Sequence, residues 1–233
     1  YAPTLALREL HPEYADRIPS VAEQFTPDNH HDMVRFEIMK QFGYFVTESS
    51  EHSSEYYPWF IKKDHPELID RFHIPLDEYP RRCRDQIARW KQQAEHLVHN
   101  ENLTHTRSSE YAAGIIEALE TGRTFGFAGN VLNTGLIDNL PFDACVEVSC
   151  MVNEGHLSPC HMGPLPNQLA ALNRRQIEVH QLTVDAALTR KKEYIYQAAM
   201  LDPHAGSELT IDEIRSLVDD LIQAHGDWLP EYH

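Results

Sequence analysis

The sequence has few positive charges, and it lacks long apolar runs. Its 20 Lys and Arg residues stand against 36 Asp and Glu residues, which gives a net charge of −16 at pH 7. A charge of this sign repels phosphate backbones and anionic membranes, so we expect neither nucleic acid nor a membrane as a partner. No apolar run approaches the roughly 18–20 residues that a membrane span needs, and no signal peptide opens the chain.

Cysteine is scarce as well, with four among 233 residues, which is too few for a disulfide scaffold. Their spacing forms neither a CxxC pair nor a paired zinc finger: Cys83, Cys145, Cys150 and Cys160. The dipeptides at residues 30–31 and 160–161 do not supply the four ligands of a closed structural metal site. We therefore expect a reducing, cytoplasmic compartment and no metal ion held by this chain.

The glycine-rich loops that cradle nucleotide phosphates are also missing. Neither GxGxxG nor a P-loop occurs in the sequence, so we expect no NAD to bind to this chain alone. The chain starts at Tyr1 without an initiator Met, which favours a processed or cut piece of a longer protein.

The pattern that is present is helix-rich α+β, with few strands. Apolar residues recur at helical steps over residues 30–41, 76–98 and 167–188, whereas residues 124–133 and 144–153 have the composition and alternation of strands. The second of these helices is highly charged, with a thin apolar stripe of Leu76, Cys83, Ile87, Trp90 and Leu97. The order of elements is not the alternating βαβ of a nucleotide-binding sheet.

Capping residues predict where other helices begin and end. Ser108 or Ser109 is expected to cap a helix that Gly122 ends. Thr210 and Glu213 have the spacing of a capping box, which predicts a helix that starts after Thr210.

The segment GYFVTESSEHSSEY, residues 43–56, combines hydroxyl groups and carboxylates next to aromatic residues. Such a mixture is typical of a solvated loop, which is the commoner case. It is also what a sugar pocket needs, because hydrogen-bonding groups meet the sugar hydroxyls and aromatic faces meet its CH side. The composition leaves both interpretations open.

Three residues ahead of this segment are also candidates for chemistry. Asp32 and Arg35 lie three apart on one helical face, so they either pair with each other or line a pocket together. Tyr44 follows Gly43, where the helix must stop. Such a tyrosine is usually a half-buried aromatic residue, and it acts as a general base only where its surroundings lower its pKa from about 10.

Five segments in the same order resemble the α-galactosidases (melibiases) of glycoside hydrolase family 4. They are VRFEIMKQFGYFVTESSEHSSEYYPWFIK, PLDEYPRRC, GLIDNLPFDACVEV, GPLPNQLAALNR and SLVDDLIQAHGDWLP. The resemblance extends from about residue 28 to residue 230. It implies a substrate domain over residues 28–233, similar to the C-terminal domain of lactate and malate dehydrogenases, and leaves residues 1–27 unassigned.

The family implies an oxidation–elimination–addition mechanism, an exception among glycosidases. NAD⁺ oxidises the hydroxyl on carbon 3 of the sugar, a base removes the proton on carbon 2, the aglycone leaves, water adds and the hydride returns. A divalent metal, usually Mn²⁺, holds the oxygens on carbons 2 and 3. In the family, NAD and metal belong to an N-terminal nucleotide-binding domain. This sequence has no match to that domain, so we expect it to be a partner of the chain.

Residue roles follow from the resemblance position by position. Tyr44 looks like the base that removes the carbon 2 proton. Asp32 and Arg35 look like the pair that lines the metal and the sugar oxygens, where Asp32 polarises Tyr44 or a water and Arg35 stabilises the enolate charge. The predicted residues that look like sugar contacts are Arg35, Glu48, Ser49, His52, Asn133 and Asn139.

Three functions therefore remain open. The resemblance favours an α-galactosidase that is active only together with the nucleotide-binding domain, and that forms a homo-oligomer. An α-galacturonidase of the same family is the second, and a cationic residue near carbon 6 of the sugar would favour it. The third is a sugar-binding or oligomerisation module without catalysis.

Overall fold

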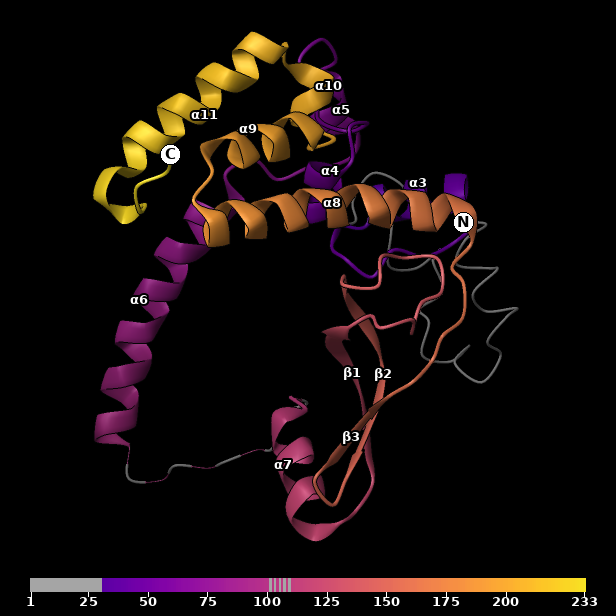
Figure 1. The fold of residues 1–233 in the computed structure, drawn as a ribbon. Helices are drawn as coiled ribbons and strands as arrows, with labels where there is room; N and C mark the ends of the chain where they lie inside the picture. The colour runs from indigo at the N-terminus through magenta and orange to yellow at the C-terminus, as the bar shows by residue number, and fades with distance from the viewer. Residues whose placement is uncertain (1–30, 101, 103, 105, 107, 109) are drawn as a thin grey trace. The chain divides into compact units, whose positions relative to one another are not determined.

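A computed structural model describes residues 31–100, 102, 104, 106, 108 and 110–233. The unassigned segment 1–27 and the candidate cap Ser109 lie outside the described residues. The chain divides into two compact units. The first holds the described residues up to Ile74, together with Leu132–Val146 and His161–His233, and the second holds Pro75–Val131 and Glu147–Cys160. The colours of Figure 1 follow the chain through both units.

The first unit starts with three helices, α3 (Met33–Phe42), α4 (Ser50–Tyr56) and α5 (Glu67–Arg71). Gly43 ends α3 in the left-handed conformation, with φ 81°, as the sequence predicts. The serine-rich segment after it is not a loop, because it forms α4. We did not expect this helix, since its seven residues, SEHSSEY, carry no helical repeat of apolar side chains.

An apolar core joins α3 to α5 and to the segments on either side of α5. Val34, Ile38, Phe60, Phe72 and Ile74 are buried in it. The rings of Phe60 and Phe72 meet edge to face, with centroids 5.1 Å apart. The core therefore fixes one face of α3, while Tyr44 and Phe45, directly after Gly43, are exposed.

Four helices complete the first unit: α8 (Asn167–Thr189), α9 (Lys192–Leu201), α10 (Ala205–Glu208) and α11 (Ile211–His225). A short 3-10 turn, Gly226–Trp228, follows them. α9 packs against α8 on one side and against α11 on the other, as the orange and yellow ribbons of Figure 1 show. The predicted capping box is confirmed, since the Thr210 hydroxyl accepts from the Glu213 backbone and the Glu213 carboxylate accepts in return from the Thr210 backbone.

The amide of Asn133 holds together the turn between the two long strands. Its side-chain nitrogen donates to the carbonyls of Ile137, Leu140 and Pro141, at 2.9–3.2 Å. Its side-chain oxygen accepts from the Ile137 backbone at 2.7 Å. Because Asn133 is fully buried, these bonds satisfy backbone groups that water cannot reach.

An ion pair joins residues that are far apart in the sequence within this unit. Glu208 of α10 pairs with Lys62 and accepts from the Lys63 backbone at 2.8 Å. The hydrogen bond from Lys62, followed by that from the Lys63 backbone, lowers the pKa of Glu208 to about 2. The ion pair therefore connects α10 with the segment that follows Phe60.

The second unit contains α6 (Glu78–His99), α7 (Ala112–Thr121) and most of a three-stranded sheet in the order β1 (Phe125–Leu132), β2 (Cys145–Asn153) and β3 (His156–Pro159). The two predicted strands are confirmed. β3 was not expected, and it pairs antiparallel with β2, Val152 opposite Leu157. Pro80 lies in the first turn of α6, where its missing N–H costs nothing.

The predicted cap of α7 is wrong. The helix begins at Ala112 after Tyr111, without a side-chain cap, and the Ser108 hydroxyl instead accepts from the Glu110 backbone at 3.3 Å. Gly122 ends the helix as predicted, with φ 73°. Within the described residues, no helix is both long enough and apolar enough to cross a membrane.

Asn133→Ala is expected to destabilise the protein by about 2–4 kcal/mol. The change leaves several buried carbonyls and one buried N–H without partners, and each unsatisfied group costs about 1–3 kcal/mol. Urea unfolding followed by circular dichroism measures the loss. Asn173→Ala is the matched control, since among the described residues that exposed amide bonds only to the Leu169 carbonyl of its own helix. Equal stability of the two variants would contradict a structural role for Asn133.

Glu208→Gln is expected to lower the thermal midpoint at pH 7 and to have little effect near pH 2. The pKa of Glu208 is lowered on folding, so its contribution is complete above its unfolded pKa of about 4.5 and is lost as the pH falls toward 2. Thermal unfolding of both proteins from pH 7 to pH 2 tests this. A midpoint difference that stays constant over this range would contradict the ion pair.

Candidate functional site

The Arg35 guanidinium holds the segment that follows Tyr44. Its Nε donates to the Val46 carbonyl at 3.0 Å, and its Nη2 donates to the Thr47 carbonyl at 3.3 Å. Its carbon Cζ lies 4.2 Å from the centre of the Phe45 ring, which is cation–π stacking. One cation on α3 thus determines the path of three consecutive residues that lie beyond the end of the helix.

Asp32 and Arg35 form the pair that their spacing predicts. Arg35 Nη1 donates to Asp32 Oδ1 at 3.1 Å. An Arg side chain has five N–H groups, and the bonds to protein oxygens use three of them. Two N–H groups of Arg35 therefore remain without a partner among the described residues. The two alternatives for this pair are compatible, because Arg35 binds Asp32 and still keeps donors for a further ligand.

Tyr44 lies at the surface, directly after the glycine that ends α3. Half of its surface is exposed. Its hydroxyl has no hydrogen-bond partner among the described residues. Tyr44 is therefore not a packed core aromatic residue, and its hydroxyl is accessible to a ligand.

The serines of α4 serve mainly to build the helix. The Ser49 hydroxyl caps α4 by accepting from the His52 backbone at 3.2 Å, and the Glu48 carboxylate accepts from the Ser49 backbone at 2.7 Å. The buried Ser50 hydroxyl accepts from the Arg35 backbone at 3.3 Å, and this bond ties α4 to α3. Thus Ser49 and Glu48 lie at the N-terminal end of α4, which begins six residues after Tyr44.

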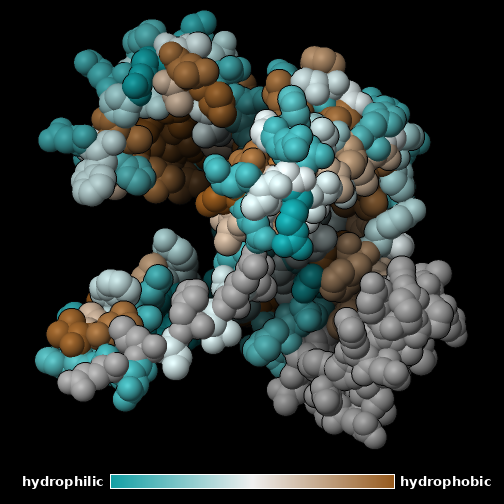
Figure 2. All heavy atoms as spheres, turned by 90° about the horizontal axis from the view of Figure 1, so that it is seen from below, coloured by the Kyte–Doolittle hydropathy of each residue, from teal (hydrophilic) through white to brown (hydrophobic). Residues whose placement is uncertain are grey.

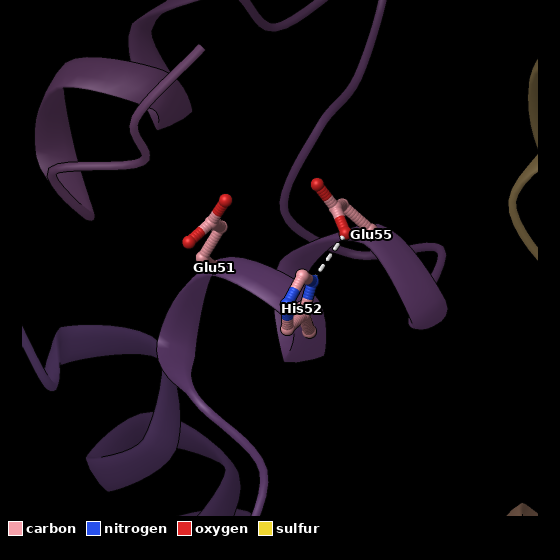
Figure 3. Close-up of side chains that lie close together, drawn as sticks. All are labelled: Glu51, His52 and Glu55. Atoms are coloured by element: carbon pink, nitrogen blue, oxygen red, sulfur yellow. Dashed lines mark hydrogen bonds and ion pairs between the residues drawn. The ribbon is translucent and has the colours of Figure 1, made fainter. Parts of the chain in front are cut away.

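His52 projects from α4 next to two carboxylates (Figure 3). Its Nδ1 and Glu55 Oε2 are 2.9 Å apart. The hydrogen bond to Glu55 raises the pKa of His52 above its ordinary value, and the negative charges of Glu55, Glu48 and Glu51 raise it further, against the effect of partial burial. His52 is therefore a cation over a wider pH range than a free histidine.

In the described part of the chain, one group of three side chains is close enough together to ligate a metal ion, and it lies in this cluster. Donor atoms of Glu51, His52 and Glu55 lie within 4.8 Å of one another. His52 and Glu55 already satisfy each other by their hydrogen bond, so nothing in this geometry calls for an ion. The sequence has no glycine-rich phosphate loop, and the expectation that this chain alone binds no NAD stays a prediction.

Aromatic rings continue the surface beyond α4. Trp59 stacks on Tyr57 with ring centroids 5.2 Å apart and on Phe42 with centroids 5.4 Å apart. Burial raises the pKa of Tyr57, and it raises that of Tyr56, next to the charges of Glu48 and Glu55. Both tyrosine hydroxyls therefore stay protonated at neutral pH, and the rings of Tyr56 and Trp59 remain partly exposed, at 44% and 41%.

The predicted residues Asn133 and Asn139 have structural partners. Besides the turn bonds of Asn133, Asn139 Nδ2 donates to the Leu165 carbonyl at 2.8 Å, and Asn139 Oδ1 accepts from the Leu165 backbone at 2.9 Å. The structure brings Asp32 and Arg35 together and places Glu48, Ser49 and His52 at the start of α4. Among the described residues, no hydrogen bond joins these residues to either asparagine, and the sugar contacts of both stay predictions.

Sequence reasoning missed two glutamines of α8 that hold this surface in place. Gln168 donates to the Phe42 carbonyl at 3.4 Å, and Gln176 donates to the Tyr56 carbonyl at 3.2 Å. A hollow of about 520 Å³ lies nearby, lined by residues that include Phe42, Trp59 and Arg71. Tyr44, Asp32 and Arg35 are not among the residues that line it.

Glu55→Gln is expected to lower the pKa of His52, because the acceptor of its hydrogen bond loses its charge. NMR titration of the imidazole protons measures this directly. Because the folded pKa is raised, the pair stabilises the fold fully below about pH 6.5, the unfolded value, and this stabilisation is lost as the pH rises through the folded value. Glu48→Gln is the control, with a smaller shift expected since Glu48 acts only through space. An unchanged His52 pKa in Glu55→Gln would contradict the assignment.

Comparisons with known proteins place the chain among the glycosidases. The model of the family 4 glycosyl hydrolase C-terminal domain matches residues 6–205. The α-galactosidase of Bacillus subtilis is 57% identical over 224 residues, which cover 96% of this chain and 51% of that protein. An α-galacturonidase of Lachnoclostridium phytofermentans is 26% identical over 200 residues, 85% of this chain and 43% of that protein.

Solved structures have the same fold. A crystal structure described as that of a glucosidase from Bacillus subtilis matches with a TM-score of 0.74 at 22% identity, over 94% of this chain and 50% of that one. A 6-phospho-α-glucosidase from gut microorganisms, solved with NAD and Mn²⁺, matches with a TM-score of 0.60 at 21% identity, over 85% of this chain and 44% of that one. The predicted α+β class is confirmed.

The chain spans about half the length of the curated relatives that it matches. Its family model covers 200 residues of the 233 and carries the description of a C-terminal domain. The family resemblance drawn from the five sequence segments is therefore confirmed, and the chain belongs to family 4 of the glycosyl hydrolases as the C-terminal part of such an enzyme.

Proposed function

We propose that this chain supplies the substrate side of an α-galactosidase site, which a nucleotide-binding domain completes. The single observation that carries the proposal is the exposed Tyr44 hydroxyl. It has no partner among the described residues, and it precedes a segment that Arg35 holds by two hydrogen bonds and a stacking contact. A side chain that is both accessible and attached to a fixed segment suits a catalytic group, which has to meet its substrate in one geometry.

In this proposal Tyr44 accepts the proton from carbon 2 of the sugar. The two unused N–H groups of Arg35 donate to the oxygen on which negative charge develops, and Asp32 keeps the guanidinium in position. Glu48, Ser49 and His52 meet the sugar hydroxyls, and the same contact is proposed for Asn133 and Asn139. Structures of the family contain NAD and Mn²⁺, but residues of this chain do not fit either group, so we assign it no hydride transfer and no metal ligand.

An α-galacturonidase is the second candidate within the family. Identity to the α-galactosidase is 57%, against 26% to the α-galacturonidase, and this difference favours the galactoside. A carboxylate on carbon 6 of the sugar needs a cation, and in this proposal the two unused N–H groups of Arg35 already serve the oxygen on which negative charge develops. A sugar-binding module without catalysis is less favoured, since sugar binding does not require an unpartnered tyrosine hydroxyl.

We also propose a cellular compartment and protein partners for the enzyme. Four free cysteines suit a reducing compartment, so we place the protein in the cytoplasm. The partner that we propose is the nucleotide-binding domain, which carries the dinucleotide site in this family. We also propose that the enzyme forms a homo-oligomer.

A chimera tests the proposed activity. We expect the part of the Bacillus subtilis α-galactosidase that this chain does not match, joined to residues 1–233, to hydrolyse p-nitrophenyl-α-galactoside in the presence of NAD and Mn²⁺. The α-galacturonide should be a poor substrate, because the chain shares far more of its sequence with the galactosidase. The control is the chain alone, which should be inactive. A preference for the galacturonide would support the second candidate instead.

Tyr44→Phe in the same chimera is expected to lower kcat by about 10²–10⁴-fold, the contribution of a well-positioned general base. Stability should change by no more than about 1 kcal/mol, because the hydroxyl makes no internal hydrogen bond among the described residues. Tyr79→Phe is the matched control, an exposed tyrosine of α6 that should leave kcat unchanged. Wild-type kcat in Tyr44→Phe would remove Tyr44 from the chemistry.

A further inference from the structure

The hollow next to the end of α3 combines aromatic walls with polar side chains. Its volume of about 520 Å³ lies within the range of about 300–1,000 Å³ that is usual for small-molecule sites. The buried rings of Phe60 and Phe72 line it together with the partly exposed rings of Phe42 and Trp59. Hydrophobic residues reach the surface in other places too, as the brown spheres of Figure 2 show. An exposed ring alone therefore does not mark a site, and the polar groups of the hollow have to be considered with the rings.

Three polar side chains, Glu37, Gln41 and Arg71, also line the hollow. Gln41 Nε2 donates to Glu37 Oε1 at 2.7 Å, which orients both side chains and leaves Gln41 Oε1 without a donor among the described residues. The Arg71 carbon Cζ lies 4.9 Å from the centre of the Phe72 ring, and none of the five N–H groups of Arg71 has a hydrogen-bond partner among the described residues. The hollow therefore offers both donors and an acceptor beside its aromatic rings.

The charges of the hollow favour a neutral ligand. Glu37 and Arg71 have opposite charges and line the same hollow, so a phosphate or carboxylate that Arg71 attracts is repelled by Glu37. Lys40, whose Nζ lies 3.7 Å from Glu37, is not among the lining residues. A sugar ring is neutral, its hydroxyls both donate and accept hydrogen bonds, and its CH side packs on aromatic rings. The combination of groups in the hollow therefore fits one sugar unit.

The hollow is close to Tyr44 along the chain. Phe42 lines it and Tyr44 follows two residues later, so their Cα atoms lie within about 7 Å of each other. Ile38 and Phe42, which both line the hollow, are the third and seventh residues after Arg35 and so lie on the same face of α3 as Arg35. A disaccharide with one ring at Tyr44 is therefore long enough to place its other ring in the hollow.

We propose that the hollow binds the leaving-group sugar of an α-galactoside, the ring that is released when the bond at carbon 1 of the galactose breaks. Arg71 and Gln41 meet the hydroxyls of this ring, and Phe42 and Trp59 meet its CH side. The inference rests on the proposed function for the position of the galactose ring, whereas binding of a sugar in the hollow does not depend on catalysis. The preferred substrates are then galactosides of a second sugar rather than galactosides of a small alcohol.

NMR of the full 233-residue chain tests the binding without any need for activity. The chain has three tryptophans, so its spectrum has three indole N–H signals, which Trp→Phe variants assign. Titration with glucose, and with the galactosyl-glucose disaccharide melibiose, is expected to shift the Trp59 signal until it saturates. The signals of Trp90 and Trp228, which do not line the hollow, should stay in place and serve as controls in the same sample. A Trp59 signal that does not move at millimolar sugar would overturn the proposal.

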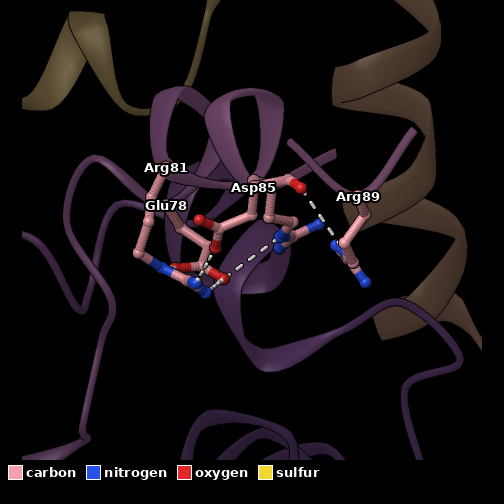
Figure 4. Close-up of polar contacts among 5 residues, drawn as sticks. Glu78, Arg81, Asp85 and Arg89 are labelled. Carbon is pink, nitrogen blue, oxygen red and sulfur yellow. Dashed lines mark hydrogen bonds and ion pairs between the residues drawn. The ribbon is translucent and has the colours of Figure 1, made fainter. Parts of the chain in front are cut away.

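Arg71→Leu is expected to weaken sugar binding by about tenfold or more, because it removes hydrogen bonds from a charged donor. Arg89→Leu is the matched control, since Arg89 is an exposed arginine of α6 whose Nε donates to the Asp85 carbonyl of its own helix at 3.4 Å (Figure 4). Circular dichroism confirms that both variants keep their helices. Equal affinity of Arg71→Leu and the wild-type chain for melibiose would contradict the assignment of Arg71 to the site.

Kinetics of the chimera with the Bacillus subtilis α-galactosidase show which ring the hollow takes. Arg71→Leu is expected to lower kcat/KM for melibiose by about tenfold more than kcat/KM for methyl α-galactoside, whose leaving group has no ring to place in the hollow. Equal losses for the two substrates would overturn the assignment to the leaving group. A chimera that is inactive toward every α-galactoside would instead refute the proposed function, and the Trp59 signal would still decide whether the hollow binds a sugar.

Discussion

The candidate site depends on one cation, Arg35, and on the residues that it holds. A helix that ends in a left-handed glycine releases its chain to solvent, and the next few residues have no regular structure to fix them. Here the guanidinium spans that gap, with hydrogen bonds to Val46 and Thr47 and a stacking contact with Phe45. Asp32 fixes the guanidinium in turn, so the short path from Gly43 to α4 is defined although it lies at the surface.

Much of this arrangement was predictable from the sequence where the signal is local. A glycine after an apolar repeat marked the end of α3, and a Thr–Glu spacing marked the start of α11. Alternation of buried side chains marked β2, where Val146, Val148 and Cys150 are buried. Each signal lies within a few residues of the feature that it predicts, so a single sequence is enough to find it.

The features that were missed depend on partners distant in the sequence or on polar helices. α4 is built from serines and glutamates, so it lacks the apolar repeat that predicts a helix, and its cap forms where a loop was expected. The contacts from Gln168 and Gln176 to backbone carbonyls cross more than a hundred residues. The site residues themselves came from a family resemblance, and the sequence alone could not distinguish a structural amide such as Asn133 from one that meets a sugar.

The central claim is that Tyr44 removes the carbon 2 proton of the sugar, and exchange of that proton with solvent measures it most directly. The chimera with the Bacillus subtilis α-galactosidase, turning over an α-galactoside in deuterated water, is predicted to place deuterium on carbon 2 of the released galactose. With Tyr44→Phe this exchange should slow by about 100-fold or more, in step with the loss of kcat. Exchange at the wild-type rate in Tyr44→Phe would contradict the account, because the proton would then leave through another residue.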